Sequence, residues 1–385
     1  MKDDGLDSVN VDDSGLEVEE IESSESESVE GQIGDEIFRP FDPSQIRVET
    51  KPMVMSLLLD RIRNEEIDLA PGFQRKGGIW STKAKSRLIE SLLIRIPLPA
   101  FYMDGTDENH WLVVDGLQRL SAMKEFVIDK TYRLRGLEFL SDYEGLAFLE
   151  LPRKLQRRVM ETQITVFLIQ EHTPPEVKFN IFKRINTGGL PLSTQEIRHA
   201  LNQGPAADLL ATLADDDSFL EATRHGISDT RMGARECVLR FIAFALTIPQ
   251  EYRSYDLDLF LNHTMSELNR MPSVELDNIS NRFRRAMTSN ISLWGKNAFR
   301  KRRRDVDRRG PINRALFEIW SVTMDRLTDQ EVNILEERQD ALNELLIEAF
   351  DDRFFDASIS YGTGDPRKVS YRFSKAEDIV REVLA

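Results

Sequence analysis

The chain has 385 residues, of which 41% are hydrophobic and 30% are charged, so it is long enough for two domains of ordinary size. No stretch approaches the roughly 18 apolar residues that a membrane span requires, which excludes membrane-embedded function classes. The single cysteine, Cys237, excludes an internal disulfide and a cysteine-based zinc site. It lies in an apolar helical run, so we expect it to be inert in the core of a cytoplasmic protein.

The net charge of −15 is concentrated at the beginning of the chain. Residues 1–37 contain 14 Asp and Glu against one Lys, a local charge of −13, which leaves −2 for the rest. With no aromatic residue and few apolar ones, this segment is predicted to be a disordered acidic tail and not a signal peptide. Its simplest role is to keep the protein in solution. The alternative is a decoy that covers a basic groove until DNA displaces it.

The first half of the body alternates between helix and strand patterns. Apolar residues at helical spacing predict a helix over 83–96, and two prolines end it. Strands are predicted over 100–103, 110–114 and 163–169. Asp104-Gly105 is predicted to begin the loop between the first two strands. A helix follows a Pro-Pro pair, and the spacing of Ser193 and Glu196 predicts a capping box that begins another.

Strand patterns fade in the second half of the chain. Helices are predicted over 237–246, 257–268, 312–324 and 331–350. The predicted fold class is therefore α+β, with a mixed-sheet domain over 38–204 and an all-helical C-terminal domain over 205–385.

The stretch 111–126 carries the most specific signal. An apolar strand leads directly into Asp115-Gly116 and then into a helix that contains Arg119. Free backbone N–H groups, a carboxylate and a guanidinium at one turn suit a phosphate-bearing ligand. Asp115 could bind Mg²⁺ or orient water, and Arg119 could hold a phosphate. Alternatively, Asp115 only caps the helix that begins at Leu117. Three apolar residues are expected to face the core: Leu117, Leu120 and Phe126.

Two other segments combine basic side chains with turn residues. Gln74 and Arg75 precede paired glycines and offer donors to phosphate oxygens, although a surface loop with Trp80 packed on the sheet explains the segment equally well. Arg184 and Asn186 end a helix before another pair of glycines. A helix C-cap followed by a turn would account for these residues too.

Residues 300–309 contain seven basic residues in ten: Arg300, Lys301, Arg302, Arg303, Arg304, Arg308 and Arg309. Such a run would contact the DNA backbone with an affinity that falls steeply with salt. The alternative is a solvated helix end.

Several catalytic classes are excluded by missing motifs. The sequence contains no P-loop, no Gly-x-Ser-x-Gly elbow and no His-Glu-x-x-His motif. Its five histidines are scattered, which gives no support to a histidine-metal nuclease centre.

Taken together, four ordered segments resemble one family: residues 73–80, 88–99, 115–119 and 182–193. They resemble the N-terminal domain of GmrSD-type restriction proteins, which belongs to the ParB/sulfiredoxin-like superfamily. Two later segments, 235–241 and 358–365, look like the helical continuation of stand-alone members.

The resemblance implies a nucleotide-binding domain in bacterial or archaeal defence against phage DNA. Its usual signature, Asp-Gly-Gln-Gln-Arg, is linked to nucleoside triphosphate hydrolysis, and here Leu117 replaces the first Gln. The residues that match the family's motifs are Gln74, Arg75, Asp115, Gly116, Gln118, Arg119, Arg184 and Asn186. The C-terminal His-Asn-His nuclease domain of full-length members is not recognisable, so a partner nuclease is expected to make any cut.

The resulting hypothesis is a protein that binds a nucleoside triphosphate with Mg²⁺ and couples this to DNA recognition. Asp115, Gln118 and Arg119 would be catalytic, and Asp115 would hold the metal. Gln74, Arg75 and the Arg184 region would complete the nucleotide site. One alternative is a non-catalytic, nucleotide-gated DNA-binding or adaptor protein, which the Leu117 substitution favours. Another is a DNA nickase that uses Asp115. No membrane partner is expected, and a homo-oligomer is left open.

Overall fold

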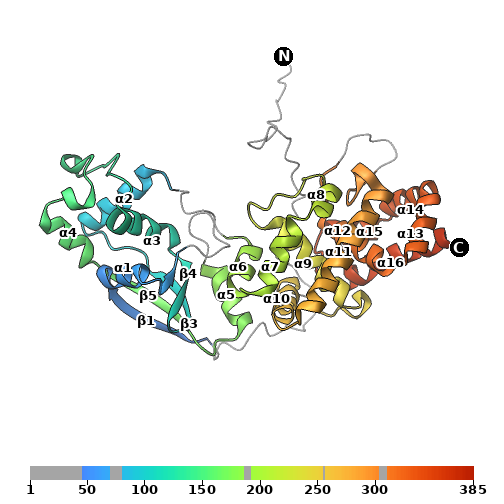
Figure 1. Ribbon diagram of the computed structural model, residues 1–385, viewed down its shortest axis with the longest axis horizontal. Coiled ribbons are helices and arrows are strands. Elements are labelled where there is room, and N and C mark those ends of the chain that lie inside the picture. Colours follow the sequence, from blue (N-terminus) through green and yellow to red (C-terminus); the bar gives the residue numbers. More distant parts are fainter. Residues whose placement is uncertain (1–45, 70–79, 186–191, 255, 303–309) are drawn as a thin grey trace, which may run out of the picture. The chain divides into compact units, whose positions relative to one another are not determined.

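The computed structural model describes residues 46–69, 80–185, 192–254, 256–302 and 310–385 (Figure 1). These fall into two compact units, which we call the N-terminal unit (up to Leu201) and the helical unit (Asn202–Ala385). The predicted α+β class is confirmed, because a mixed sheet with helices is followed by helices. The narrower ParB/sulfiredoxin-like assignment stays a prediction. The predicted acidic tail lies outside the described residues.

The N-terminal unit contains a five-stranded sheet with the order β1-β5-β3-β4-β2. Its strands are β1 (Val48–Val54), β2 (Ile67–Asp68), β3 (Phe101–Asp107), β4 (His110–Asp115) and β5 (Gln163–Gln170). β3 runs parallel to β5 and antiparallel to β4, while β1 pairs antiparallel with β5 and β2 parallel with β4. β1 was not predicted from the sequence; it is an exposed edge strand that contains Pro52.

Four helices build the larger core of the N-terminal unit. They are α1 (Met55–Arg63), α2 (Thr82–Leu93), α3 (Leu117–Lys124) and α4 (Arg153–Met160). Their buried residues, such as Ile89 and Leu120, form one cluster with Phe101, Met103 and Val166 of the sheet. Apolar residues at alternate positions of the strands produce this packed face. The core therefore fixes α3, and with it the turn that precedes α3.

A smaller core contains the helices α5 (Pro175–Ile185) and α6 (Thr194–Leu201). Phe179 and Phe182 of α5 pack there with Val114 at the end of β4. The predicted capping box begins α6, since Ser193 Oγ accepts a 3.1 Å hydrogen bond from the Glu196 N–H and the Glu196 carboxylate accepts the Ser193 N–H. α5 is thus packed beside the residue that precedes Asp115.

The described part of the helical unit consists of helices and their connections. The helices are α7 (Pro205–Ala214), α8 (Asp217–Thr223), α9 (Gly233–Leu246), α10 (Leu257–Leu268), α11 (Ser273–Trp294), α12 (Arg314–Arg326), α13 (Asp329–Glu337), α14 (Gln339–Asp351), α15 (Arg353–Ser360) and α16 (Pro366–Leu384). Cys237 is buried in α9 as predicted, and burial raises the pKa of its thiol to about 12. None of the described helices is both long enough and apolar enough to cross a membrane.

The segment 331–350 is helical as predicted, but it is divided into two helices. The chain forms α13 and α14 there, with a break at Arg338, whose φ and ψ of −105° and 28° are not helical. The buried residues Val332, Leu335, Leu342 and Leu346 keep a helical spacing across the break. Their periodicity therefore looks continuous in the sequence, although the backbone is not.

Candidate functional site

The end of β4 contains a β-bulge. Met103 pairs with Val113, but the next residue back in β3, Tyr102, pairs with Asp115, so Val114 is an extra residue in β4. A bulge changes the direction of the side chains that follow it and is common beside functional sites. It delivers Asp115 to the junction between the sheet and α3.

Gly116 follows with a φ of +100°, in the region that favours glycine, and is the N-cap residue of α3. A Cβ at this position would also overlap the Phe101 ring. No side chain caps α3. The alternative interpretation of Asp115 as a helix cap is therefore wrong.

The Asp115 carboxylate is paired with Arg119 instead. Arg119 Nη2 donates a 2.7 Å hydrogen bond to Asp115 Oδ2 and a 3.2 Å bond to the carbonyl oxygen of Ala100. Arg119 Nη1 donates to the carbonyl oxygen of Pro99, and the guanidinium lies 4.5 Å from the centre of the Phe101 ring. Arg119 thus joins the turn to the beginning of β3.

The two charges of this pair are unequally accessible. The Asp115 side chain is 27% exposed and that of Arg119 is 12% exposed. Burial raises the pKa of Asp115, while Arg119 and the Gly116 N–H oppose that rise. Burial also lowers the pKa of Arg119. Arg119 thus favours the charged form of Asp115, and part of the carboxylate remains exposed.

The other predicted site residues are less closely associated. Gln118 is half-buried in the first turn of α3, while Leu117 is 7% exposed and packs in the larger core, as expected. Arg184 is exposed in the last turn of α5. Among the described residues, no hydrogen bond or ion pair joins Arg184 to Asp115 or Arg119. Gln74, Arg75 and Asn186 lie outside the described residues.

A buried charged cluster near this turn was missed. Lys178 Nζ of α5 lies 3.2 Å from Asp104 Oδ2, and both Lys178 Nζ and Asp104 contact the Thr106 hydroxyl. The predicted loop at Asp104-Gly105 is wrong, because β3 continues to Asp107. An Asp-Gly pair is typical of a turn, so a buried Asp104 opposite a helical lysine could not be expected from the local pattern.

Among the described residues, no group of three or more His, Cys, Asp or Glu could hold a metal ion.

Comparison with known proteins identifies the part of the chain that contains this turn. Residues 56–202 match the model of a family described as the GmrSD restriction endonuclease, N-terminal domain. This segment is a GmrSD-type N-terminal domain. The resemblance predicted from the motifs is confirmed over these residues. No curated protein and no solved structure matches the chain.

The basic run 300–309 lies outside the GmrSD-type domain, and its described members are not free surface cations. Arg300 is 3% exposed and donates from Nη1 to the carbonyl oxygen of Gly310. Lys301 contacts Ser360 and forms an ion pair with Asp356. The expectation of an exposed side chain is wrong for Arg300, because the interior of the helical unit encloses it.

Arg302 is also engaged. Its Nη1 donates to Asn343, its guanidinium lies 5.0 Å from the centre of a Trp294 ring, and burial lowers its pKa to about 10. Four members of the run lie outside the described residues: Arg303, Arg304, Arg308 and Arg309. Their contact with DNA stays a prediction.

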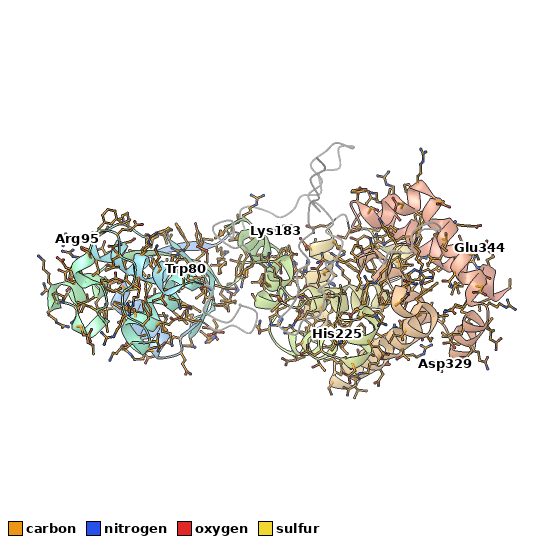
Figure 2. All side chains as sticks on the ribbon, turned by 90° about the horizontal axis from the view of Figure 1, so that it is seen from above. Trp80, Arg95, Lys183, His225, Asp329 and Glu344 are labelled. Carbon is orange, nitrogen blue, oxygen red and sulfur yellow. The ribbon has the colours of Figure 1, made fainter. Side chains whose placement is uncertain are left out.

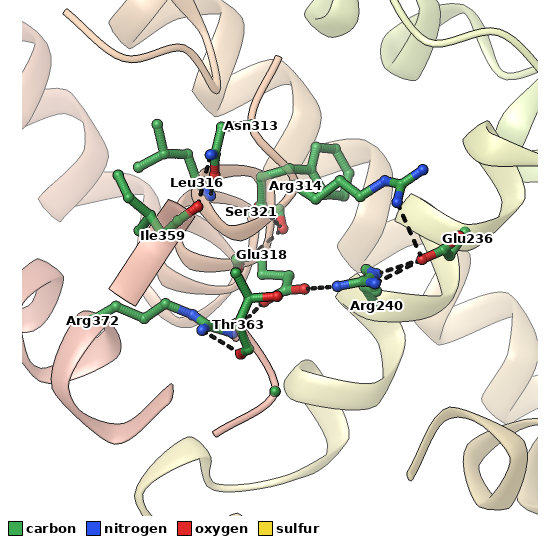
Figure 3. A network of polar contacts seen from close by, with 12 residues as sticks. Glu236, Arg240, Asn313, Arg314, Leu316, Glu318, Ser321, Ile359, Thr363 and Arg372 are labelled. Carbon is green, nitrogen blue, oxygen red and sulfur yellow. Dashed lines mark hydrogen bonds and ion pairs between the residues drawn. The ribbon is translucent and has the colours of Figure 1, made fainter. Parts of the chain in front are cut away.

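Beyond the GmrSD-type domain, Figure 3 shows a buried network of charges in the helical unit. Glu318, fully buried in α12, accepts a 2.8 Å hydrogen bond from Arg240 and a 2.6 Å bond from Arg372. Arg240 also binds Glu236, one turn away in α9. Arg372 donates in addition to the carbonyl oxygen of Thr363 at 2.6 Å. Every charge in this chain of contacts has an opposite partner.

The network connects the two later segments that resemble the family's helical continuation. Residues 235–241 supply Glu236 and Arg240, and residues 358–365 supply carbonyl oxygens to Arg372. Glu236, Arg240 and Arg372 are buried, so these three charges are explained by the folding of the helical unit. Whether the family extends over these segments stays a prediction.

Proposed function

We propose that the GmrSD-type domain binds a nucleoside triphosphate at the Asp115 turn and hydrolyses it. Binding and hydrolysis would be coupled to DNA recognition in a restriction-type defence system. The observation that supports this function best is a partly exposed carboxylate, placed by a bulge and a left-handed glycine and held by a fixed guanidinium. Such a positioned carboxylate is a common requirement of phosphoryl transfer.

The beginning of α3 would bind the phosphates. The first hydrogen bond within α3 is donated by Leu120 to the Gly116 carbonyl oxygen. The N–H groups of the three preceding residues therefore point out of the first turn without a helical acceptor. The helix dipole adds to their attraction for an anion. Gln118, which is half-buried in this turn, would add a side-chain donor.

Mg²⁺ fits the carboxylate at this turn. Asp115 offers hard oxygen atoms, and Mg²⁺ is commonly held by one or two carboxylates together with water and substrate phosphates. When bound, the ion would neutralise the phosphate charge. Arg119 would act as a positioning residue, because its guanidinium is already bonded to Asp115 and two backbone carbonyl oxygens. This differs from the phosphate-binding role expected from the sequence.

The rival function is a nucleotide-gated switch without hydrolysis, for which Leu117 was the main support. Leu117 faces the larger core, so its side chain does not lie on the outer surface of the turn. Its presence is explained by packing and removes no polar group from that surface. We therefore retain hydrolysis as the proposed function and treat binding without turnover as an outcome of the test.

The test measures nucleotide binding and phosphate release with each nucleoside triphosphate, with and without DNA. It compares Asp115→Asn with Asp107→Asn, an exposed carboxylate at the end of β3. Loss of turnover by at least about 100-fold in Asp115→Asn alone supports the proposal. Binding without turnover in the unmodified protein supports the switch, and nicking without nucleotide supports a nickase. Equal behaviour of the two variants would refute the site.

A further inference from the structure

The helix α4 presents an exposed row of cations. Residues 152–160 contain four basic residues and no acidic one. Leu155 and Val159 are buried in the larger core, so the helix is anchored by its apolar side. Arg153, Lys154 and Arg157 are exposed on the remaining surface, and their positions i, i+1 and i+4 place them on neighbouring turns.

Arg95 extends this surface from a second element. The remaining basic residue of α4, Arg158, donates a 2.5 Å hydrogen bond to the carbonyl oxygen of Leu93, the last residue of α2. Arg95 follows two residues later with a φ of +67° and is exposed. Figures 1 and 2 show α4 and Arg95 at the same end of the N-terminal unit. In Figure 2, Lys183 lies well away from Arg95.

None of these four cations has an acidic partner among the described residues. Neighbouring elements show the usual pairing: Arg61–Glu66, Arg63–Asp60, Lys85–Glu125, Arg87–Glu138, Lys124–Asp129 and Arg133–Glu150. Glu150, the acidic residue shortly before α4, is thus already paired with Arg133. We call the unneutralised surface of Arg95, Arg153, Lys154 and Arg157 the α4 basic face.

We propose that the α4 basic face binds the phosphodiester backbone of a nucleic-acid duplex. Arg153 and Arg157 are separated by a rise of about 6 Å along the helix, which is close to the span of two nucleotides of one strand at about 3.4 Å each along the duplex axis. Cations without acidic partners release bound counterions from such a strand most effectively. The inference rests on the DNA-recognition part of the proposed function and names the surface that performs it.

An anionic membrane fits this face less well. A helix that binds a bilayer surface inserts its apolar side among the lipids. The apolar residues Leu155 and Val159 of α4 are already buried against the protein core. Only charges remain for an external partner, which favours a rigid, hydrated polyanion.

The test replaces three cations in the full chain, as Arg153→Gln, Lys154→Gln and Arg157→Gln together. Glutamine keeps the helix propensity close to that of Arg and Lys, and Arg158 is retained because it contacts α2. The control has the same change in net charge at paired cations: Arg63→Gln, Arg87→Gln and Lys124→Gln. Binding of a mixed-sequence DNA duplex is titrated over a series of salt concentrations, with an RNA duplex of equal length as a second arm.

The triple variant should bind the DNA duplex at least about tenfold more weakly than the control variant at about 0.1 M salt. Its plot of log affinity against log salt should be shallower by about 2.7, since each lost phosphate contact removes about 0.9. Equal weakening with RNA assigns the face to the shared backbone, and weakening with DNA alone assigns it to the DNA duplex.

Three outcomes would overturn the proposal: no measurable duplex binding by the unmodified chain at low salt, an unchanged affinity and slope in the triple variant, or an equal loss in the control. A fourth would be a triple variant that no longer binds phosphatidylserine vesicles, tested in parallel, but binds the duplex as the unmodified chain does. Nucleotide binding is measured in the same samples. If nucleotide binding is absent while the salt dependence of duplex binding changes as expected, the proposed nucleotide site is refuted and the α4 basic face is still supported.

Discussion

Arg119 donates a 2.7 Å hydrogen bond to Asp115 across the junction between β4 and α3, while the same guanidinium holds the carbonyl oxygens of Pro99 and Ala100. The pair therefore couples the carboxylate to the backbone at the beginning of β3. A change in either residue should affect both the charge and the position of the other.

Arg119→Lys should shift the acidic limb of the pH profile of kcat/KM to higher pH. Arg119 opposes the rise in the pKa of Asp115 that burial causes, and a lysine cannot reproduce its several hydrogen bonds. Asp115 would then bind its proton more tightly, and a higher pH would be needed to ionise it. Phosphate release measured across a pH series tests this, and an unmoved limb would show that Asp115 ionisation does not control the reaction.

Gly116→Ala should destabilise the N-terminal unit by about 2 to 5 kcal/mol. The left-handed backbone costs about 1 to 2 kcal/mol with a side chain, and crowding of a packed core costs about 1 to 3 more. Gly145→Ala is the matched control, because Gly145 has a φ of +79° with no atom within 4 Å of an added Cβ. Urea unfolding measures both variants. Equal losses would mean that Phe101 moves aside without cost.

Leu117→Gln should destabilise the domain by about 1 to 3 kcal/mol, since it buries an amide in the larger core. It should not raise nucleotide turnover. This variant restores the residue of the family signature, so hydrolysis appearing only in Leu117→Gln would instead favour the switch. Thermal unfolding and phosphate release are measured on the same preparation.

Glu318→Gln should destabilise the helical unit by about 3 to 5 kcal/mol, because Arg240 and Arg372 would remain buried without their shared carboxylate. Asp378→Asn is the control. Its side chain is 63% exposed and pairs with Arg381, so it should cost less than about 1 kcal/mol. Chemical denaturation compares the two, and similar losses would show that the network contributes no more than a surface pair.

Glu90→Gln should destabilise the N-terminal unit at neutral pH, and the difference from the unmodified protein should shrink in acid. Burial raises the pKa of Glu90, but the N–H groups of Glu138, Phe139 and Leu140, with Arg87, outweigh it and hold the pKa below its ordinary value. A lowered folded-state pKa contributes stability above the unfolded pKa of about 4.3, and this stability is lost as pH falls through the folded value. Urea midpoints at neutral and acidic pH measure this, and a constant difference would contradict it.

The sequence predicted features that depend on local patterns. The capping box of Ser193 and Glu196, the burial of Cys237 and the end of β4 all follow from neighbouring residues, and the motifs located the GmrSD-type domain. It did not predict the orientation of Arg119, although Asp and Arg four residues apart commonly form ion pairs. That spacing applies within a helix, whereas Asp115 is the last residue of a strand.

Burial of charge was the least predictable property. The exposed α4 basic face and the enclosed Arg300 both belong to basic segments, and tertiary packing distinguishes them. Lys178 looks like a surface residue of α5 until Asp104 is placed opposite it by the continuation of β3. Such pairs join residues far apart in the chain, so local sequence patterns carry little information about them.

The contact between Glu318 and Arg372 also has a consequence for biosynthesis. Glu318 leaves the ribosome 54 residues before Arg372, and until α16 has been made its carboxylate has only Arg240 as a guanidinium partner. Burying that carboxylate with half of its partners would be unfavourable. During translation, α12 should therefore remain loosely packed, and the helical unit should reach its final structure only after the segment 366–384 has emerged.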